Sequence, residues 1–217
     1  RRWVTTASSS CLIPMTADRI SATFAACAKD GRAAFVGYLM AADPDIETSF
    51  ENLKALSAAG ADIIELGAPF TDPMADGPAI QKAAQRALKS GGSLSVTLEI
   101  ARRFRSVNNS TPLIVMGYTN PIHRMGYSAF ARAAAQAGVD GVITVDLPPE
   151  EDAPLRTELA AHGVAVIRLA TPTTTESRMK RIAARHSARG IPRAPMSPAA
   201  RCSGAGRWGT RRDICPG

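Results

Sequence analysis

Short apolar runs alternate with amphipathic segments along the middle of the chain. Residues 33–40 form one such run, which ends at a turn over residues 42–45. This pattern predicts a buried strand followed by a helix from Ile46 to Ala59, with a cap before the helix and Gly60 after it. A second apolar run over residues 62–66 predicts the next strand.

The same alternation recurs further along the chain. Three more strands are predicted at residues 112–118, 139–147 and 164–169. Three more helices are predicted at residues 128–137, 151–161 and 174–184. Five predicted strands therefore alternate with helices.

Continuously apolar strands joined by helices are typical of a parallel sheet that helices cover. A doubly wound nucleotide-binding sheet usually carries a glycine-rich phosphate loop, and neither GxGxxG nor GxxxxGK followed by Ser or Thr occurs in the sequence. We therefore predict an α/β fold of the (β/α)8 TIM-barrel type. About five strand–helix units are recognisable, so the barrel is predicted to be incomplete.

Polar residues follow the predicted strands at the position where catalytic groups of a barrel lie. Asp43 follows the first strand, Glu65 lies near the end of the second, and Asp146 ends the fourth. Tyr118 and Asn120 come at the end of the third strand. Because parallel strands end at one rim, we expect these side chains to converge there.

Glu65 is an acid within an otherwise apolar strand, between Ile64 and Leu66. Burial there is expected to raise its pKa, which suits a general acid–base. The alternative is a buried carboxylate that backbone or hydroxyl groups satisfy. Asp72 and Asp76 lie in the following loop, whose prolines and glycine restrict the backbone. Each of these two acids could instead stabilise its own turn.

The segment from Glu65 to Pro78, ELGAPFTDPMADGP, closely resembles the signature loop of the tryptophan synthase alpha chain family. Further support comes from Ala42-Asp43-Pro44, Gln81, Tyr118-Thr119-Asn120 and Val145-Asp146-Leu147-Pro148. Together these motifs cover roughly residues 20–182 in the order expected for the family.

The resemblance implies a carbon–carbon lyase of tryptophan biosynthesis, which cleaves indole-3-glycerol phosphate to indole and glyceraldehyde 3-phosphate by a retro-aldol reaction. It assigns Glu65 and Asp76 as the catalytic pair. Glu65 would protonate the indole ring carbon and help remove the side-chain hydroxyl proton, while Asp76 would accept the indole N–H and stabilise developing positive charge. Tyr118 and Asp146 would bind substrate; packing and a loop hydrogen bond are their respective alternatives.

The resemblance also implies an α2β2 complex with a tryptophan synthase beta chain. The loop that carries Asp72 and the region of Asn120 would contact this partner. Neither a metal nor an organic cofactor is expected on this chain, and pyridoxal phosphate would belong to the beta chain.

The net charge of +7 is concentrated at the two ends of the sequence. Residues 183–217 hold seven arginines and one aspartate, and Arg1 and Arg2 add positive charge, so the middle of the chain is nearly neutral. A nucleic-acid-binding tail usually interleaves aromatic residues with its charges, and Trp208 is the only aromatic residue of Phe, Trp or Tyr type in this segment. We therefore expect no nucleic-acid partner.

Four scattered cysteines form no CxxC pair, so neither a zinc site nor a disulfide framework is indicated. A reducing cytoplasm is the simpler setting. His123, His162 and His186 also lack the spacing of metal ligands. No run of about 18 apolar residues occurs, and no membrane partner is expected.

The predicted domain covers residues 15–183, with Met15 as the expected natural start and residues 1–14 as an extension outside the family pattern. Residues 184–217 form an aperiodic basic stretch, which we expect to be disordered. Translation in a shifted frame would produce such a change of composition, and a natural basic tail is the alternative.

The basic stretch stands where further strand–helix units of a barrel are expected. A barrel usually binds phosphate with the loops after its seventh and eighth strands. Two hypotheses follow: an alpha-chain lyase, and a truncated noncatalytic fragment that at most binds the beta chain.

Overall fold

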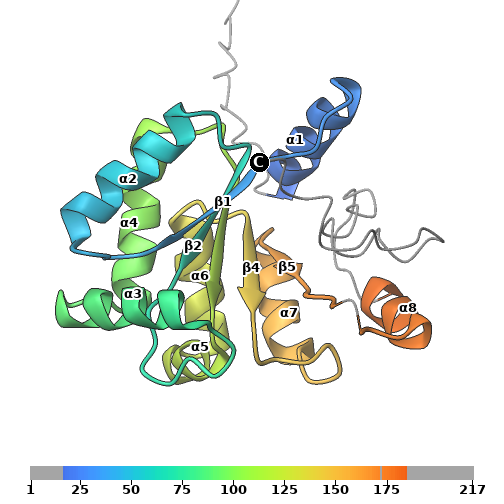
Figure 1. Cartoon of the computed structure of the whole chain (residues 1–217). Coiled ribbons are helices and arrows are strands. Elements are labelled where there is room, and N and C mark those ends of the chain that lie inside the picture. The colour runs from blue at the N-terminus through green and yellow to red at the C-terminus, as the bar shows by residue number, and fades with distance from the viewer. Residues whose placement is uncertain (1–16, 172, 185–217) are drawn as a thin grey trace, which may run out of the picture.

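The computed structural model describes residues 17–171 and 173–184, which form a curved parallel sheet with helices packed around it (Figure 1). Within these residues the sheet has the strand order β1-β2-β3-β4-β5, and each strand is parallel to the next. The strands are β1 (Val36–Met40), β2 (Ile63–Gly67), β3 (Leu113–Gly117), β4 (Gly141–Thr144) and β5 (Ala165–Ile167).

Helices precede, connect and follow these strands. They are α1 (Ala17–Lys29), α2 (Ile46–Ala58), α3 (Pro78–Lys89), α4 (Leu94–Val107), α5 (Thr119–Met125), α6 (Tyr127–Gln136), α7 (Ala153–Ala161) and α8 (Glu176–Ala184). The sequence pattern correctly predicted α2, α6, α7 and α8. It did not identify α1, α3, α4 or α5.

The predicted strands are confirmed, although β1, β3, β4 and β5 are shorter than their predicted ranges. β1 starts only at Val36, where pairing with Ile63 begins, and β4 ends at Thr144, opposite Gly117.

The outer face of the sheet packs against helices. Helix α2 begins where the Asp45 carboxylate accepts the backbone N–H of Thr48 at 2.8 Å, which is the cap predicted from the sequence. Its buried Phe50 and Leu53 face the main core. That core also takes alternate residues of the strands, such as Leu66, Val115, Val142 and Val166.

The inner, concave face carries the other half of each strand. Tyr38, Glu65, Ile114 and Gly141 are register partners along successive strands, so they form one row across this face. Nearer the amino ends of the strands, Ile20 of α1 packs against a small apolar cluster that contains Ile63, Ile114, Ile143 and Ala165. Helix α1 thus packs at the amino ends, and the site lies at the opposite ends.

A buried charge network fastens the amino-end side of the sheet. The Asp140 carboxylate, fully buried, accepts hydrogen bonds from the Arg19 and Arg105 guanidinium groups and from the backbone N–H of Leu113. Arg105 also donates to the Gly138 carbonyl at 2.7 Å. Burial lowers the pKa of Arg105 to about 10, so this group remains cationic at neutral pH. The network ties α1 and α4 to β3 and β4.

Several sequence predictions concern segments beyond the part that the structure describes. The predicted extension at residues 1–14 and the predicted tail from residue 185 onward lie outside the described residues. Among the helices within residues 17–171 and 173–184, none has the length and apolar character needed to cross a bilayer.

Candidate functional site

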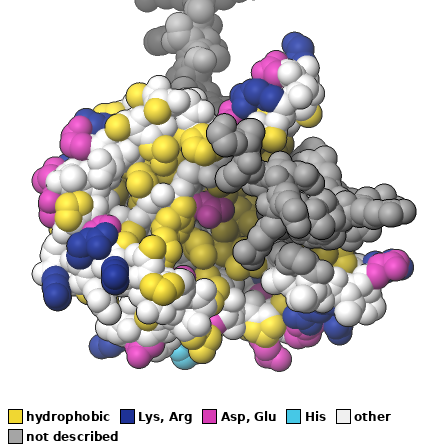
Figure 2. Space-filling view, in the orientation of Figure 1, with side chains coloured by type: hydrophobic (Ala, Val, Ile, Leu, Met, Phe, Trp, Pro, Cys, Tyr) yellow, Lys and Arg dark blue, Asp and Glu magenta, His cyan; other side chains and the backbone are white. Residues whose placement is uncertain are grey.

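Glu65 projects from β2 onto the concave face of the sheet. Its side chain is half-buried beside strand residues that are buried on both sides, Ile64 and Leu66. Burial raises the pKa of the Glu65 carboxyl, as predicted. Within the described residues no hydrogen bond or ion pair satisfies this carboxylate, which argues against a purely structural buried acid. Figure 2 shows acidic side chains in the middle of an apolar surface on this face of the molecule.

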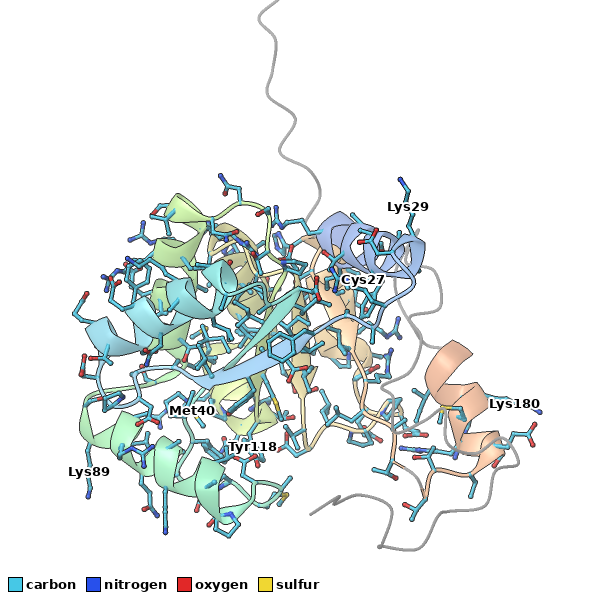
Figure 3. All side chains as sticks on the ribbon, turned by 45° about the horizontal axis from the view of Figure 1, so that its top comes forward. Cys27, Lys29, Met40, Lys89, Tyr118 and Lys180 are labelled. Atoms are coloured by element: carbon cyan, nitrogen blue, oxygen red, sulfur yellow. The ribbon has the colours of Figure 1, made fainter. Side chains whose placement is uncertain are left out.

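The loop between β2 and α3 is fastened to Tyr118, which lies directly after β3. The backbone N–H of Ala75 donates to the Tyr118 hydroxyl at 3.1 Å, and the rings of Phe70 and Tyr118 lie 5.2 Å apart at 31°. At the other end of the loop, the Gln81 side-chain amide donates to the Asp76 carbonyl at 2.9 Å. Figure 3 shows Tyr118 at the end of the sheet next to α3. The loop is therefore held at the carboxyl ends of the strands.

Asp76 is the partly buried acid of this loop. Burial raises the pKa of its carboxyl, while hydrogen bonding from the Tyr118 hydroxyl acts in the opposite direction. Burial also raises the pKa of Tyr118, which keeps its hydroxyl protonated and able to donate. Asp76 and Tyr118 thus come together at the carboxyl ends of the strands.

Tyr38 of β1 is a residue that the sequence analysis missed. Burial raises the pKa of its phenol well above the ordinary value, and the charges of Asp76 and Glu65 raise it further. Both carboxylates therefore lie close enough to the phenol to affect its ionisation. The available signal was the alternation within the first strand, which places Tyr38 on the same face as Met40 and, by register, beside Glu65.

Asp146 lies in the loop after β4, where its carboxylate is used within the protein. One oxygen accepts both the backbone N–H and the hydroxyl of Thr119, each at 2.8 Å. This is the loop hydrogen bond that the sequence analysis kept as the alternative, and a role in substrate binding stays a prediction. Asn120 follows in the first turn of α5, with an exposed side chain.

Asp43 lies after β1 as predicted, but its carboxylate is directed to α3. Arg86 donates to both carboxylate oxygens at 2.7 Å. The preceding residue, Ala42, is buried with a left-handed φ of 62°, and its backbone is held by the hydroxyls of Ser49 and Ser90. At this rim Asp43 fastens the first loop to α3.

Asp72 lies at the exposed tip of the loop, where its carboxylate accepts the hydroxyl of Thr71 at 2.5 Å. Met74, two residues further, exposes 83% of its surface. A depression of about 370 Å³ lies beside them, lined by Phe70, Thr71, Asp72, Pro73, Met74, Gln81, Gln85 and Leu88. This outer side of the loop is separate from Glu65.

A second depression, of about 410 Å³, lies at the ends of β4 and β5. Its lining includes Asp146, Asp152 and Arg178, and the buried Asp152 is paired with Arg156 and Arg168. Across the part of the chain that the structure describes, no group of three or more His, Cys, Asp or Glu side chains is arranged to hold a metal ion.

The described residues thus form a parallel α/β sheet with partly buried carboxylates near the carboxyl ends of its strands, where the active sites of barrel enzymes lie. Residues 24–190 match the family model for the tryptophan synthase alpha chain. The chain belongs to the tryptophan synthase alpha chain family.

Individual relatives agree with this assignment. The chain is 58% identical over 173 residues to the tryptophan synthase alpha chain of Phenylobacterium zucineum (strain HLK1). The aligned residues make up 80% of this chain and 62% of that protein. It is 56% identical over 173 residues to the tryptophan synthase alpha chain of Caulobacter sp. (strain K31), and these residues make up 80% of this chain and 63% of that protein. The chain spans less than two thirds of the length of these relatives.

Solved structures confirm the barrel class. The tryptophan synthase alpha subunit of Legionella pneumophila str. Paris superposes with a TM-score of 0.75 at 41% identity, covering 77% of this chain and 64% of that chain. A chain from a structure of the tryptophan synthase α2β2 complex of Pyrococcus furiosus superposes with a TM-score of 0.68 at 39% identity. The superposition covers 71% of this chain and 63% of that chain. The sheet described above corresponds to part of that barrel.

Proposed function

We propose that this chain acts as a tryptophan synthase alpha subunit, a lyase that cleaves indole-3-glycerol phosphate to indole and glyceraldehyde 3-phosphate. The observation that carries the proposal is that two partly buried carboxylates, Glu65 of β2 and Asp76 of the following loop, both lie near enough to the Tyr38 phenol to raise its pKa. Neither acid is neutralised by an ion pair in the described part of the chain, so both are available to a substrate.

The raised pKa of Glu65 favours its protonated form at the start of the reaction. Glu65 donates its proton to the indole ring carbon that bears the side chain, and the ring becomes cationic. The resulting carboxylate then takes the proton of the hydroxyl on the adjacent side-chain carbon. As this carbon becomes the aldehyde of glyceraldehyde 3-phosphate, the carbon–carbon bond breaks and its electron pair returns to the ring. The cycle consumes no proton.

Asp76 supports this chemistry as an anion. Its carboxylate accepts the indole N–H and stabilises the positive charge that the ring carries after protonation. Tyr118, which hydrogen-bonds to the same loop, holds Asp76 in position and packs beside the indole. In this scheme the chain itself uses neither metal nor organic cofactor, and pyridoxal phosphate belongs to a beta chain partner.

The proposed partner surface is the outer side of the loop after β2. The exposed Asp72 and Met74 line the depression there, and Asn120 lies exposed on α5. We expect Asp72→Ala and Asn120→Ala to weaken the association with a beta chain, measured by sedimentation of the mixed chains. Asp30→Ala, an exposed substitution after α1 at the amino-end side, is the matched control. Equal association of all variants would remove this assignment.

The alternative is a noncatalytic fragment that at most binds the beta chain. The test is release of indole from indole-3-glycerol phosphate, with and without beta chain, by the full chain and by Glu65→Gln and Asp76→Asn. We expect each substitution to lower kcat by about 100-fold or more. Glu99→Gln, on the exposed face of α4, is the control. Activity that Glu65→Gln leaves unchanged would eliminate the proposed mechanism.

A further inference from the structure

The backbone carbonyl of Asp76 is held by a side chain of the following helix. The Gln81 side-chain amide donates a hydrogen bond to this carbonyl at 2.9 Å. Gln81 lies near the start of α3, where its own backbone N–H donates to the Gly77 carbonyl at 3.0 Å, as in a regular helix. The side chain therefore turns back past the start of the helix to the residue that carries the second carboxylate of the site.

This contact differs from an ordinary helix cap. A capping side chain accepts hydrogen bonds from the free N–H groups at a helix start. The N-cap residue of α3 is Gly77, which has no side chain, and Pro78 follows at the first helical position. Gln81 instead donates to a carbonyl that precedes the cap. The hydrogen bond therefore fixes the peptide group between Asp76 and Gly77 rather than completing the helix.

Helix α3 provides a fixed base for the Gln81 side chain. Its buried residues Ala83, Ala84 and Ala87 belong to the main core. At the end of the helix, the Ser90 hydroxyl donates to the Ala42 carbonyl at 2.7 Å. Residues 71–77, by contrast, form neither helix nor strand. Gln81 thus joins an irregular loop to an element that is packed on the sheet.

The peptide groups on both sides of Asp76 take part in hydrogen bonds. The Asp76 N–H donates to the Pro73 carbonyl at 3.2 Å, and the Asp76 carbonyl accepts the Gln81 amide. Each peptide group is planar. Holding the two groups that flank Asp76 consequently restricts the direction of its Cα–Cβ bond, and with it the region that the carboxylate can reach.

We propose that Gln81 is a positioning residue of this site, whose side-chain amide directs the Asp76 carboxylate toward the indole N–H. The inference rests on the proposed function, in which that carboxylate accepts the N–H and stabilises the cationic ring. Gln81 is exposed and acts through the backbone of Asp76, so it needs no contact with the substrate. Its amide is neutral and adds no charge beside the carboxylate.

The test uses two ligands that differ only at the ring nitrogen. Indole carries the N–H that Asp76 accepts, and N-methylindole has none. Gln81→Met, in the full chain without beta chain, removes the amide and keeps the length of the side chain. We expect the Kd for indole, measured by NMR titration, to rise about fivefold, the effect of one weakened hydrogen bond. The Kd for N-methylindole is expected to stay unchanged.

Two further comparisons distinguish positioning from a general structural role. Gln136→Met, at an exposed glutamine that ends α6, is the matched control and is expected to leave both affinities unchanged. In a chain carrying Asp76→Ala, Gln81→Met is expected to have no further effect on indole binding, because the carboxylate that it positions is gone. A merely structural role would weaken the binding of both ligands in either background.

The outcomes separate this inference from the proposed function. Indole affinity that Gln81→Met leaves unchanged, an equal loss for both ligands, or an undiminished effect in the Asp76→Ala chain would each overturn the role of Gln81. A loss confined to indole, in a protein whose wild type releases no indole from indole-3-glycerol phosphate, would sustain the positioning of Asp76 and reject the lyase function. Circular dichroism of each variant verifies that the fold is retained.

Discussion

The backbone N–H of Ala75 donates a hydrogen bond to the hydroxyl of Tyr118, across 43 positions of sequence. This bond joins the loop that carries Asp76 to the end of β3, and hydrogen bonding from the same hydroxyl opposes the rise in the pKa of Asp76 that burial causes. The position of Asp76 therefore depends on a residue of another strand.

Tyr118→Phe is expected to lower kcat/KM for indole release by about tenfold, since the loop loses one hydrogen bond and Asp76 loses a donor. The pH profile gives a second readout. In the proposed reaction Asp76 acts as an anion, so activity is expected to fall as the pH decreases through its pKa. Removal of the hydroxyl raises that pKa, so the acid limb of the profile is expected to move to higher pH. An unshifted limb would show that the hydroxyl does not reach Asp76.

Gly67→Ala is expected to destabilise the protein by about 1–3 kcal/mol, because the new methyl group would overlap the Tyr38 phenol. Chemical denaturation monitored by circular dichroism measures the change. Gly117→Ala is the matched control at the end of the neighbouring strand, where the nearest contact of an added Cβ is Ala68 at an ordinary 3.4 Å. Equal stability of the two variants would contradict the placement of the phenol over Gly67.

Asp140→Ala is expected to lower the free energy of unfolding by about 3–5 kcal/mol, because it leaves the buried charges of Arg19 and Arg105 without their counter-ion. The Leu113 N–H also loses its acceptor. Thermal and urea unfolding of the variant measure the loss. Asp30→Ala, at an exposed pair with Arg32, is the control and is expected to change stability little. A small effect at Asp140 would show that water replaces the carboxylate.

Local patterns predicted the parts of the fold that depend on neighbouring residues. Glu65 could be recognised as a partly buried acid because its environment is largely its own strand. Helix α2 could be recognised from its cap and its apolar face. Helix α3 was missed although its sequence is strongly amphipathic, with the small residues Ala83, Ala84 and Ala87 on its buried face.

Relationships between distant segments could not be predicted in the same way. The salt bridge between Asp43 and Arg86 and the contact of Tyr38 with Gly67 both depend on how strands and loops pack together. The buried Asp140 was included in a predicted strand, but nothing in its local sequence indicated that two arginines from other elements would pair with it. Chain topology decides these contacts.

Glu65→Gln is expected to stabilise the protein at neutral pH while it removes activity. Burial raises the pKa of Glu65 in the folded protein above its ordinary value of about 4.5. At a pH between the unfolded-state pKa and the folded-state pKa, the folded state therefore binds more protons than the unfolded state. Linkage then makes the wild type less stable as the pH rises through this interval. Above the interval the wild type keeps an ionised, partly buried carboxylate without a partner, and glutamine has no such charge.

Thermal unfolding of both proteins as a function of pH tests this reasoning. The Glu65→Gln chain is expected to have the higher Tm at pH 7–8, and the difference is expected to shrink as the pH falls below the ordinary carboxyl pKa. Glu99→Gln is the control, because a hydrogen bond from Arg102 lowers the pKa of Glu99. Removal of the Glu99 charge is therefore not expected to stabilise the protein at neutral pH. If Glu65→Gln were instead less stable at neutral pH, the carboxylate would have a stabilising partner in the folded protein. Its ionised form would then be favoured, and the acid that the lyase reaction needs would be absent.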